Sequence, residues 1–217
     1  MRLIVLIFSL LLLAACSKGH DPESPADPVE PTEIRGVWPI VKGNHWAYKD
    51  SGYNKGVFYY TMDDTLYTKE STFVDGHFYY GTFLSLPQFF LSQTDDYTVK
   101  LFNGYNLANY IFFKQVATND SLISKKELDA MIPVNGTERN VHIITTLRGY
   151  TELTKVNGYD CIRNEFVTTY DGEVYSKDII YVKPGIGMVR SVEYERIDVT
   201  GPLVITYSRD LVSYKFR

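Results

Sequence analysis

Short aromatic and β-branched segments that alternate with turn dipeptides constrain the fold of this chain more than any other feature. The sequence contains 18 Tyr and 12 Phe, and many of them lie in runs such as those at 57–62, 77–80 and 97–102. A Gly-containing turn precedes the first run, Asp75-Gly76 precedes the second, and Asn103-Gly104 follows the third. Asp-Gly and Asn-Gly tolerate the positive φ angles of tight hairpin turns. Because these spacings leave little room for crossover helices, the strands should pair mainly antiparallel.

The same pattern continues to the C-terminus, so we predict a mainly β domain over residues 34–217. Its sheet should be single, antiparallel and either curved or an open barrel, with one or two short helices. A helix is expected over 119–131, because Asn119-Asp120-Ser121 offers a cap and Pro133 a stop. Residues 85–92 could form a second short helix or a hydrophobic loop. Further strands are expected at 110–117, 141–146, 160–169, 174–182, 188–197 and 203–209.

Glycines mark a corner in the C-terminal third of the chain. Asp171-Gly172 should turn a hairpin, Pro184-Gly185 should end the following strand, and Gly187 should begin the return strand. A phosphate-binding loop is the alternative reading of these glycines. Such a loop needs a following helix with a lysine or hydroxyl, and the sequence offers none there. We therefore interpret the corner as structural.

The N-terminus has the composition of an export signal. Arg2 precedes an apolar run from Leu3 to Leu13, and Ala14-Ala15-Cys16 follows. The pattern resembles the bacterial lipobox, which implies removal of a signal peptide at 1–15 and lipidation of Cys16 with diacylglycerol and a further acyl chain such as palmitate. The alternative is an ordinary secretory signal or a single anchoring helix, although the run is shorter than the about 20 residues of a membrane span.

Residues 16–33 should form a lipid-anchored tether. Prolines recur at 22, 25, 28 and 31 among acidic and small residues, a composition that stays extended and cannot form a core. A proline-rich ligand for another domain is the alternative. Ser17 stands where an inner-membrane retention signal has aspartate, which favours the outer membrane and leaves its periplasmic or surface-exposed side open.

Charge excludes nucleic acid as a partner class. The chain has 22 basic and 26 acidic residues and a net charge of −4. Cleavage before Cys16 would remove one basic residue and no acidic residue, which gives a mature charge of about −5. No run of lysine and arginine is available to neutralise phosphates.

Candidate catalytic and metal-binding residues are few. Once Cys16 is lipidated, Cys161 is the remaining thiol; with a base such as His45, His77 or His142 it could be a nucleophile, but its strand context favours a buried apolar side chain. Asp63-Asp64 and Asp95-Asp96 could bind calcium or assist glycan hydrolysis, but solvated turns explain them as well. The sequence contains no HExxH, CxxC, GxSxG or phosphate-loop motif, so we assign no catalytic residue, metal or cofactor.

Three segments taken together resemble small uncharacterised lipoproteins of Bacteroides-type bacteria. They are Trp46-Ala47-Tyr48, residues 156–161 and residues 181–190. The resemblance implies that the tryptophan segment opens the sheet, that the middle segment leads into a long hairpin and that the corner returns the last strands. It further implies an analogy with the curved sheets of periplasmic lipoprotein carriers, whose concave face takes acyl chains.

Two functions from different classes fit these observations. The first is a monomeric, non-enzymatic binding or assembly module of the cell envelope that recognises a hydrophobic, glycan or protein ligand. The second is an envelope hydrolase that acts on glycan or peptide bonds through carboxylates that the sequence does not identify. A deep apolar groove would favour the first, and a cleft with two convergent carboxylates the second.

Overall fold

The computed structural model describes residues 36–68, 71–74, 76–95, 97–105, 108–134, 137–197 and 201–217. All of them belong to one compact unit, Thr32–Arg217. The predicted signal peptide at 1–15, the lipidation site Cys16 and the tether at 16–33 lie outside the described residues.

The described ranges form fourteen β-strands. The strands are β1 (His45–Asn54), β2 (Val57–Tyr67), β3 (Thr72–Val74), β4 (His77–Tyr79), β5 (Gly81–Phe83), β6 (Leu86–Gln93), β7 (Thr98–Asn103), β8 (Ala108–Lys114), β9 (Ser121–Val134), β10 (Thr137–Val156), β11 (Tyr159–Tyr170), β12 (Glu173–Lys183), β13 (Gly187–Arg196) and β14 (Leu203–Lys215).

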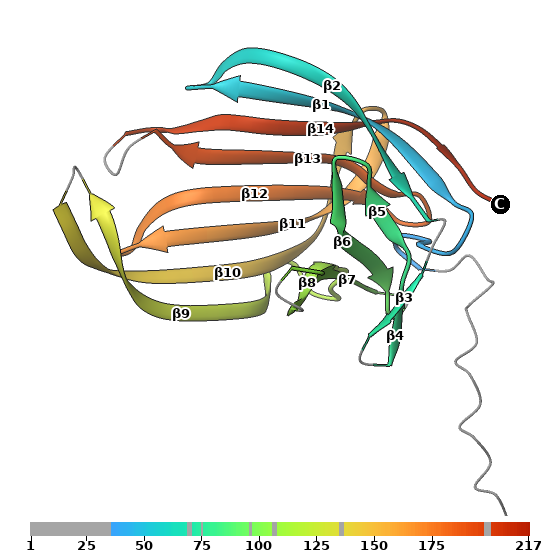
Figure 1. Ribbon diagram of the computed structural model, residues 1–217, viewed down its shortest axis with the longest axis horizontal. Helices are drawn as coiled ribbons and strands as arrows, with labels where there is room; N and C mark the ends of the chain where they lie inside the picture. The colour runs from blue at the N-terminus through green and yellow to red at the C-terminus, as the bar shows by residue number, and fades with distance from the viewer. Residues whose placement is uncertain are drawn as a thin grey trace, which may run out of the picture. The chain divides into compact units, whose positions relative to one another are not determined.

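Twelve of these strands make one antiparallel sheet in the order β8-β7-β6-β5-β2-β1-β14-β13-β12-β11-β10-β9, and β3 and β4 pair separately. The long strands from β9 round to β2 curve strongly, while β5–β8 fold across one end of them (Figure 1). The sheet is thus nearly closed on itself, which confirms the predicted curved antiparallel fold.

Three hairpin turns have the positive φ angles expected for Asp-Gly, Asn-Gly and similar Gly-containing dipeptides. Lys55-Gly56, Asn157-Gly158 and Asp171-Gly172 all have φ between 50° and 87°. Two successive positive φ angles match the right-handed twist of the flanking strands. These turns therefore fix the registers of β1–β2, β10–β11 and β11–β12.

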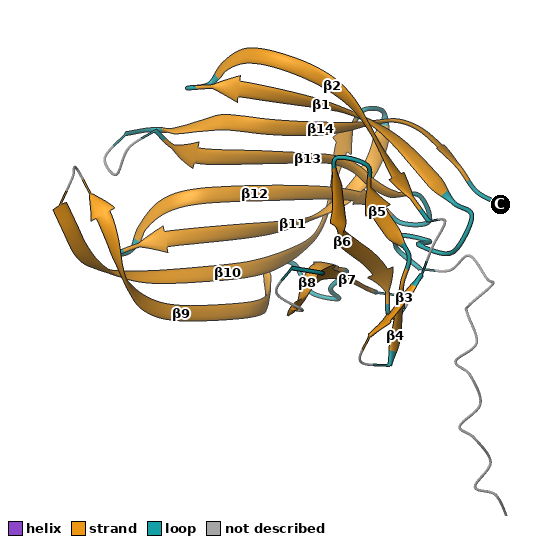
Figure 2. Ribbon diagram, in the orientation of Figure 1, coloured by secondary structure: helices purple, strands orange, loops and turns teal. Residues whose placement is uncertain are grey.

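The helix expected over 119–131 is wrong, because this segment is strand β9, and Figure 2 shows strands and loops throughout the described residues. Asp120 has a φ of 57°, which belongs to a turn, and the Asn119 side chain bonds to β10 through the Thr151 amide and the Glu152 carboxylate. Strand β9 pairs with β10 along its length except at a bulge at Ile123, so tertiary pairing overrides the helix propensity of its Lys, Glu and Leu residues. Pro133 is tolerated because β9 is an edge strand.

Other strand predictions are confirmed with different bounds. The strand expected at 141–146 is the 20-residue β10. Residues 85–92 fall mostly in strand β6, so both the short helix and the hydrophobic loop considered for them are wrong. Strand β1, which contains Trp46, is first in chain order, as the family resemblance implies, but it lies inside the sheet between β2 and β14.

The main core forms where β5–β8 fold against the long strands. It contains Trp38, Trp46, Tyr48, Leu66, Phe113 and Val182, each at most 1% exposed. Gly187, at the predicted corner, has a φ of 110°, and a Cβ there would lie 2.1 Å from the Trp38 ring. The Trp46 indole donates a hydrogen bond to the Ile186 carbonyl at 2.7 Å. The corner is therefore structural, as predicted, because it lets a tryptophan pack on bare backbone.

One buried amide ties the end of β8 to the middle of β11. Asn164 is 1% exposed; its Oδ1 accepts a hydrogen bond from the Lys114 amide at 2.7 Å, and its Nδ2 donates to the Lys114 carbonyl at 3.0 Å. Nearby, the Lys126 ammonium of β9 lies 5.2 Å from the centre of the Tyr110 ring of β8. These contacts hold β8 over the face that the sheet curves around.

Candidate ligand-binding cavity

The strand registers place two rows of side chains on the face around which the sheet curves, here called the inner face. Successive Cα partners across β11, β12, β13, β14, β1 and β2 define each row, and residues two apart on a strand share a face. The outer row is Phe166, Asp178, Glu193, Tyr207, Gly52 and Tyr60. The next row is Asn164, Ile180, Ser191, Arg209, Asp50 and Met62.

A cavity of about 780 Å³ opens on this inner face. Strands β5–β8 and the turn after β5 supply an apolar wall of Phe83, Leu86, Phe89, Leu101 and Phe112. The long strands supply further apolar residues, namely Phe166, Ile180, Met188 and Met62. Its volume lies within the range of about 300–1,000 Å³ that is typical of small-molecule sites, and its lining is mainly apolar as in such sites.

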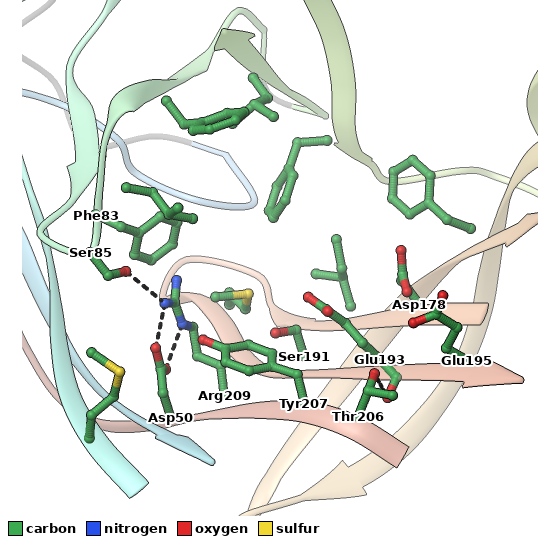
Figure 3. A pocket seen from close by; sticks show the side chains of 18 of the residues that line it. Asp50, Phe83, Ser85, Asp178, Ser191, Glu193, Glu195, Thr206, Tyr207 and Arg209 are labelled. Atoms are coloured by element: carbon green, nitrogen blue, oxygen red, sulfur yellow. Dashed lines mark hydrogen bonds and ion pairs between the residues drawn. The ribbon is translucent and has the colours of Figure 1, made fainter. Parts of the chain in front are cut away.

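A buried ionic network closes the cavity at the side of the core. The Arg209 guanidinium bonds to both oxygens of Asp50 at 2.7 and 2.6 Å and to Asp64 Oδ2 at 2.6 Å. The Asp64 carboxylate also accepts hydrogen bonds from the Thr65 and Ser85 amides and from the Ser85 hydroxyl. Figure 3 shows Arg209 between Asp50 and Ser85 at this end of the pocket. All three charged side chains are at most 7% exposed.

The Arg209 guanidinium forms its ion pairs inside this network. Burial by itself lowers the pKa of the guanidinium, but the hydrogen bond to Asp50 and the neighbouring charges outweigh burial and raise that pKa. The Phe83 ring lies 4.0 Å from the guanidinium carbon and covers it. With two carboxylates on one guanidinium, the network has one negative charge in excess and offers no free cation to a ligand.

Three carboxylates lie at the opposite end of the cavity, on β12 and β13. Asp178 is half-buried and stands directly across from Glu193, and Glu195 is two residues further along β13. Figure 3 shows Asp178 and Glu195 side by side, away from Arg209, with Glu193 between them and Tyr207. The Glu195 carboxylate accepts a hydrogen bond from the Tyr175 hydroxyl at 2.9 Å. Within the described part of the chain, neither Asp178 nor Glu193 forms an ion pair.

Their surroundings make these carboxyl groups weak acids. Burial, followed by the charge of Glu195, raises the pKa of Asp178 to about 6. Burial, followed by the charge of Asp178, raises the pKa of Glu193 to about 7. The Glu193 side chain is exposed at the cavity, whereas Asp178 is half-buried. The raised pKa of Glu193 therefore reflects the protein that surrounds the cavity and the charge of Asp178, and not full removal from water.

The described members of the paired aspartates that the sequence singled out, Asp63, Asp64 and Asp95, do not come together in one site. Asp63 is exposed on one face of β2, whereas Asp64 is buried on the other face in the network with Arg209. Asp95 accepts a hydrogen bond from the Tyr97 amide at 2.8 Å in a local turn, and Asp96 lies outside the described residues. Among the described residues, no group of three His, Cys, Asp or Glu side chains is placed to hold a metal ion.

The interpretation of Cys161 as a buried apolar side chain is confirmed. Cys161 is 0% exposed and packs with Val156 and Val189. Burial raises the pKa of its thiol to about 11, which suppresses the thiolate that a nucleophile needs. Of the histidines named with it, His142 bonds to Asp129 in an exposed pair.

Sequence reasoning missed Arg209, Asp50, Asp178 and Glu193. Asp178 alternates with Ile180 and Val182 on one face of β12, so a charge on an otherwise apolar face was the available signal. Its pairing with Glu193 depends on the β12–β13 register, which the residue pattern does not specify.

Comparisons with known proteins add a distant likeness to a solved structure. No protein-family profile matches the chain, and no curated protein matches it significantly. The crystal structure of a "putative lipoprotein" from Parabacteroides distasonis ATCC 8503 matches with a TM-score of 0.31 and 11% sequence identity, covering 85% of this chain and 100% of that one. At this level the likeness supports no argument about function. Across the described residues, no helix is present that has the length and apolarity to cross a bilayer.

Proposed function

We propose that this protein is a lipid-anchored component of the cell envelope that binds an apolar ligand inside its curved sheet and releases it unchanged. The cavity carries the proposal, because its walls place Phe83, Phe89, Phe112 and Phe166 around a space large enough for a small molecule. Removing apolar ligand surface from water contributes about 25 cal/mol for each Å² buried. An apolar molecule therefore gains most of its binding free energy from these walls.

Hydrolysis is less well supported by the same site. A glycosidase needs one carboxyl group that is protonated and a second that is ionised, and their environments must separate the two pKa values. In this cavity burial raises the pKa of both Asp178 and Glu193, to about 6 and about 7. Burial and the charge of Asp178 raise the pKa of Glu193 more than the charge of Arg209 lowers it, and among the described residues no cation offsets the burial of Asp178. Both pKa values therefore shift in the same direction, and the pair lacks the division of roles that the reaction requires.

A cavity-filling substitution tests ligand binding. Ile180 points into the cavity, whereas its neighbour Ile179 lies on the other face of β12. Ile180→Trp should weaken binding of the neutral fluorescent probe N-phenyl-1-naphthylamine at least about tenfold, while the matched control Ile179→Trp should bind it as the unmodified chain does. Circular dichroism would confirm that both variants are folded. Equal probe binding by all three proteins would contradict the proposal.

The envelope location rests on the N-terminal sequence. The apolar run and Cys16 supply an export signal and an acyl acceptor, and two or more acyl chains anchor a protein stably. The proline-rich residues 16–33 would then hold the β domain away from the lipid. Cells that express the chain should incorporate labelled palmitate into it and not into Cys16→Ser. Density separation of inner and outer membranes would test the outer-membrane assignment, and label on Cys16→Ser would refute lipidation at this residue.

A further inference from the structure

We infer that the cavity selects an apolar ligand whose polar end is an organic cation, an ammonium or substituted ammonium group. The inference rests on the proposed function, because it assigns the ligand class of the same cavity. It follows from the acidic end of the pocket, where Asp178, Glu193 and Glu195 share one short stretch of wall.

The arrangement of these carboxylates is unfavourable without a partner. Asp178 and Glu193 are directly opposite on neighbouring antiparallel strands, and like charges in that position destabilise a sheet. Glu195 adds a third acidic group on the same side of β13. Among the described lining residues Arg209 is the cationic one; its charge acts on Glu193, but its ion pairs are with Asp50 and Asp64 and not with Asp178, Glu193 or Glu195.

On the other face of the same strands, the carboxylate of Glu165 is paired with cations of the protein itself. Glu165 lies on β11, next to the position of Phe166 but on the opposite face. It forms ion pairs with Arg163 at 3.0 Å and with Lys177 at 2.9 Å. Lys177 immediately precedes Asp178 on β12 and therefore lies on the opposite face of the strand. Its charge is paired with Glu165 on that face and not with the carboxylates of the inner face. The inner-face carboxylates Asp178 and Glu193, which form no ion pair among the described residues, would therefore attract a positively charged group that enters the cavity.

The remaining lining favours an organic cation over a metal ion or a neutral group. The described residues contain no metal-binding cluster, and the wall opposite the acids is made of Phe and Leu side chains. Tyr207, directly across from Glu193, adds an aromatic ring beside the acidic pair. An ammonium group with alkyl substituents gains from both carboxylates and aromatic rings, and its alkyl chain can extend along the apolar wall.

Head-group preference at constant chain length tests the inference. Isothermal titration below the micelle concentration would compare dodecyltrimethylammonium with dodecanol and dodecanoate on the full chain at pH 8. We expect the ammonium ligand to bind at least about tenfold more tightly than dodecanol, with dodecanoate weakest. Asp178→Asn with Glu193→Gln should bring the ammonium and dodecanol affinities within about twofold of each other. The control Glu138→Gln with Asp160→Asn removes the same two charges from exposed positions and should keep the preference.

The outcomes separate this inference from the function on which it rests. Equal binding of all three dodecyl ligands would overturn the cationic head group and leave apolar binding intact. Loss of the preference in the control variant would also overturn it, because net charge and not the cavity would then be responsible. Failure of every dodecyl ligand to bind would refute both the head-group assignment and the proposed apolar site.

Discussion

Replacing Arg209 with methionine should destabilise the protein strongly, because it leaves two buried carboxylates without their cation. Asp50 and Asp64 are 2% and 1% exposed and together make three hydrogen bonds of 2.6–2.7 Å to the guanidinium. Removing one partner of a buried ion pair costs about 3–5 kcal/mol, whereas an exposed pair contributes about 0.2–1 kcal/mol. The first figure applies here, since both carboxylates are almost fully buried.

Urea unfolding followed by tryptophan fluorescence would measure this cost. Arg139→Met is the matched control, because Arg139 pairs with Asp171 at 2.8 Å but the two side chains are 57% and 39% exposed. We expect Arg209→Met to lower the free energy of unfolding by about 3–5 kcal/mol and Arg139→Met by about 1 kcal/mol or less. Similar losses in the two variants, with unchanged m values, would refute the argument that burial gives the network its importance.

Three further variants test other parts of the structure. In the folded protein the pKa values of Asp178 and Glu193 are raised to about 6 and about 7, whereas in the unfolded chain these groups lose their protons near their ordinary pKa values of 3.8 and 4.5. Stability contributed by these groups is therefore present at low pH and lost as the pH rises through that window. In urea titrations, Asp178→Asn with Glu193→Gln should be more stable than the unmodified chain at pH 8. At pH 4 the two proteins should differ little in stability. Asn164→Ala should lower the free energy of unfolding by about 1–3 kcal/mol and speed hydrogen exchange of the Lys114 amide, unless β8 is held by packing alone. Gly187→Ala should lower it by at least about 2 kcal/mol, because the new Cβ meets an indole ring and the φ of 110° is strained for alanine; a neutral effect would contradict the packing described for this corner.

Local signals in the sequence predict the sheet well where a turn and an alternating pattern agree. Asp171-Gly172 and the strands on either side of it are where the dipeptide and the aromatic runs place them. Such signals depend on a few neighbouring residues, because φ preferences and side-chain alternation are local properties.

Two kinds of feature escape local reasoning. Strand β9 has the composition of a helix and becomes a strand because β10 offers it a complete row of backbone partners. The network of Asp50, Asp64 and Arg209 joins residues up to 159 positions apart in the sequence. The sequence contains these side chains but not the registers that bring them together, and a shift of one residue would turn each of them to the other face.

Photo-crosslinking tests most directly whether the inner face of the sheet is the binding site. An alkyl probe that carries a diazirine would be activated on the full chain and its adducts mapped by peptide mass spectrometry. The exposed hairpin tip, where Val57 and Tyr59 are 70% and 75% exposed, is the competing apolar surface. Labels on peptides with Phe112, Phe166 or Met188 that decrease in Ile180→Trp are the predicted result. Labels confined to the hairpin tip and unaffected by Ile180→Trp would contradict the cavity as the site of binding.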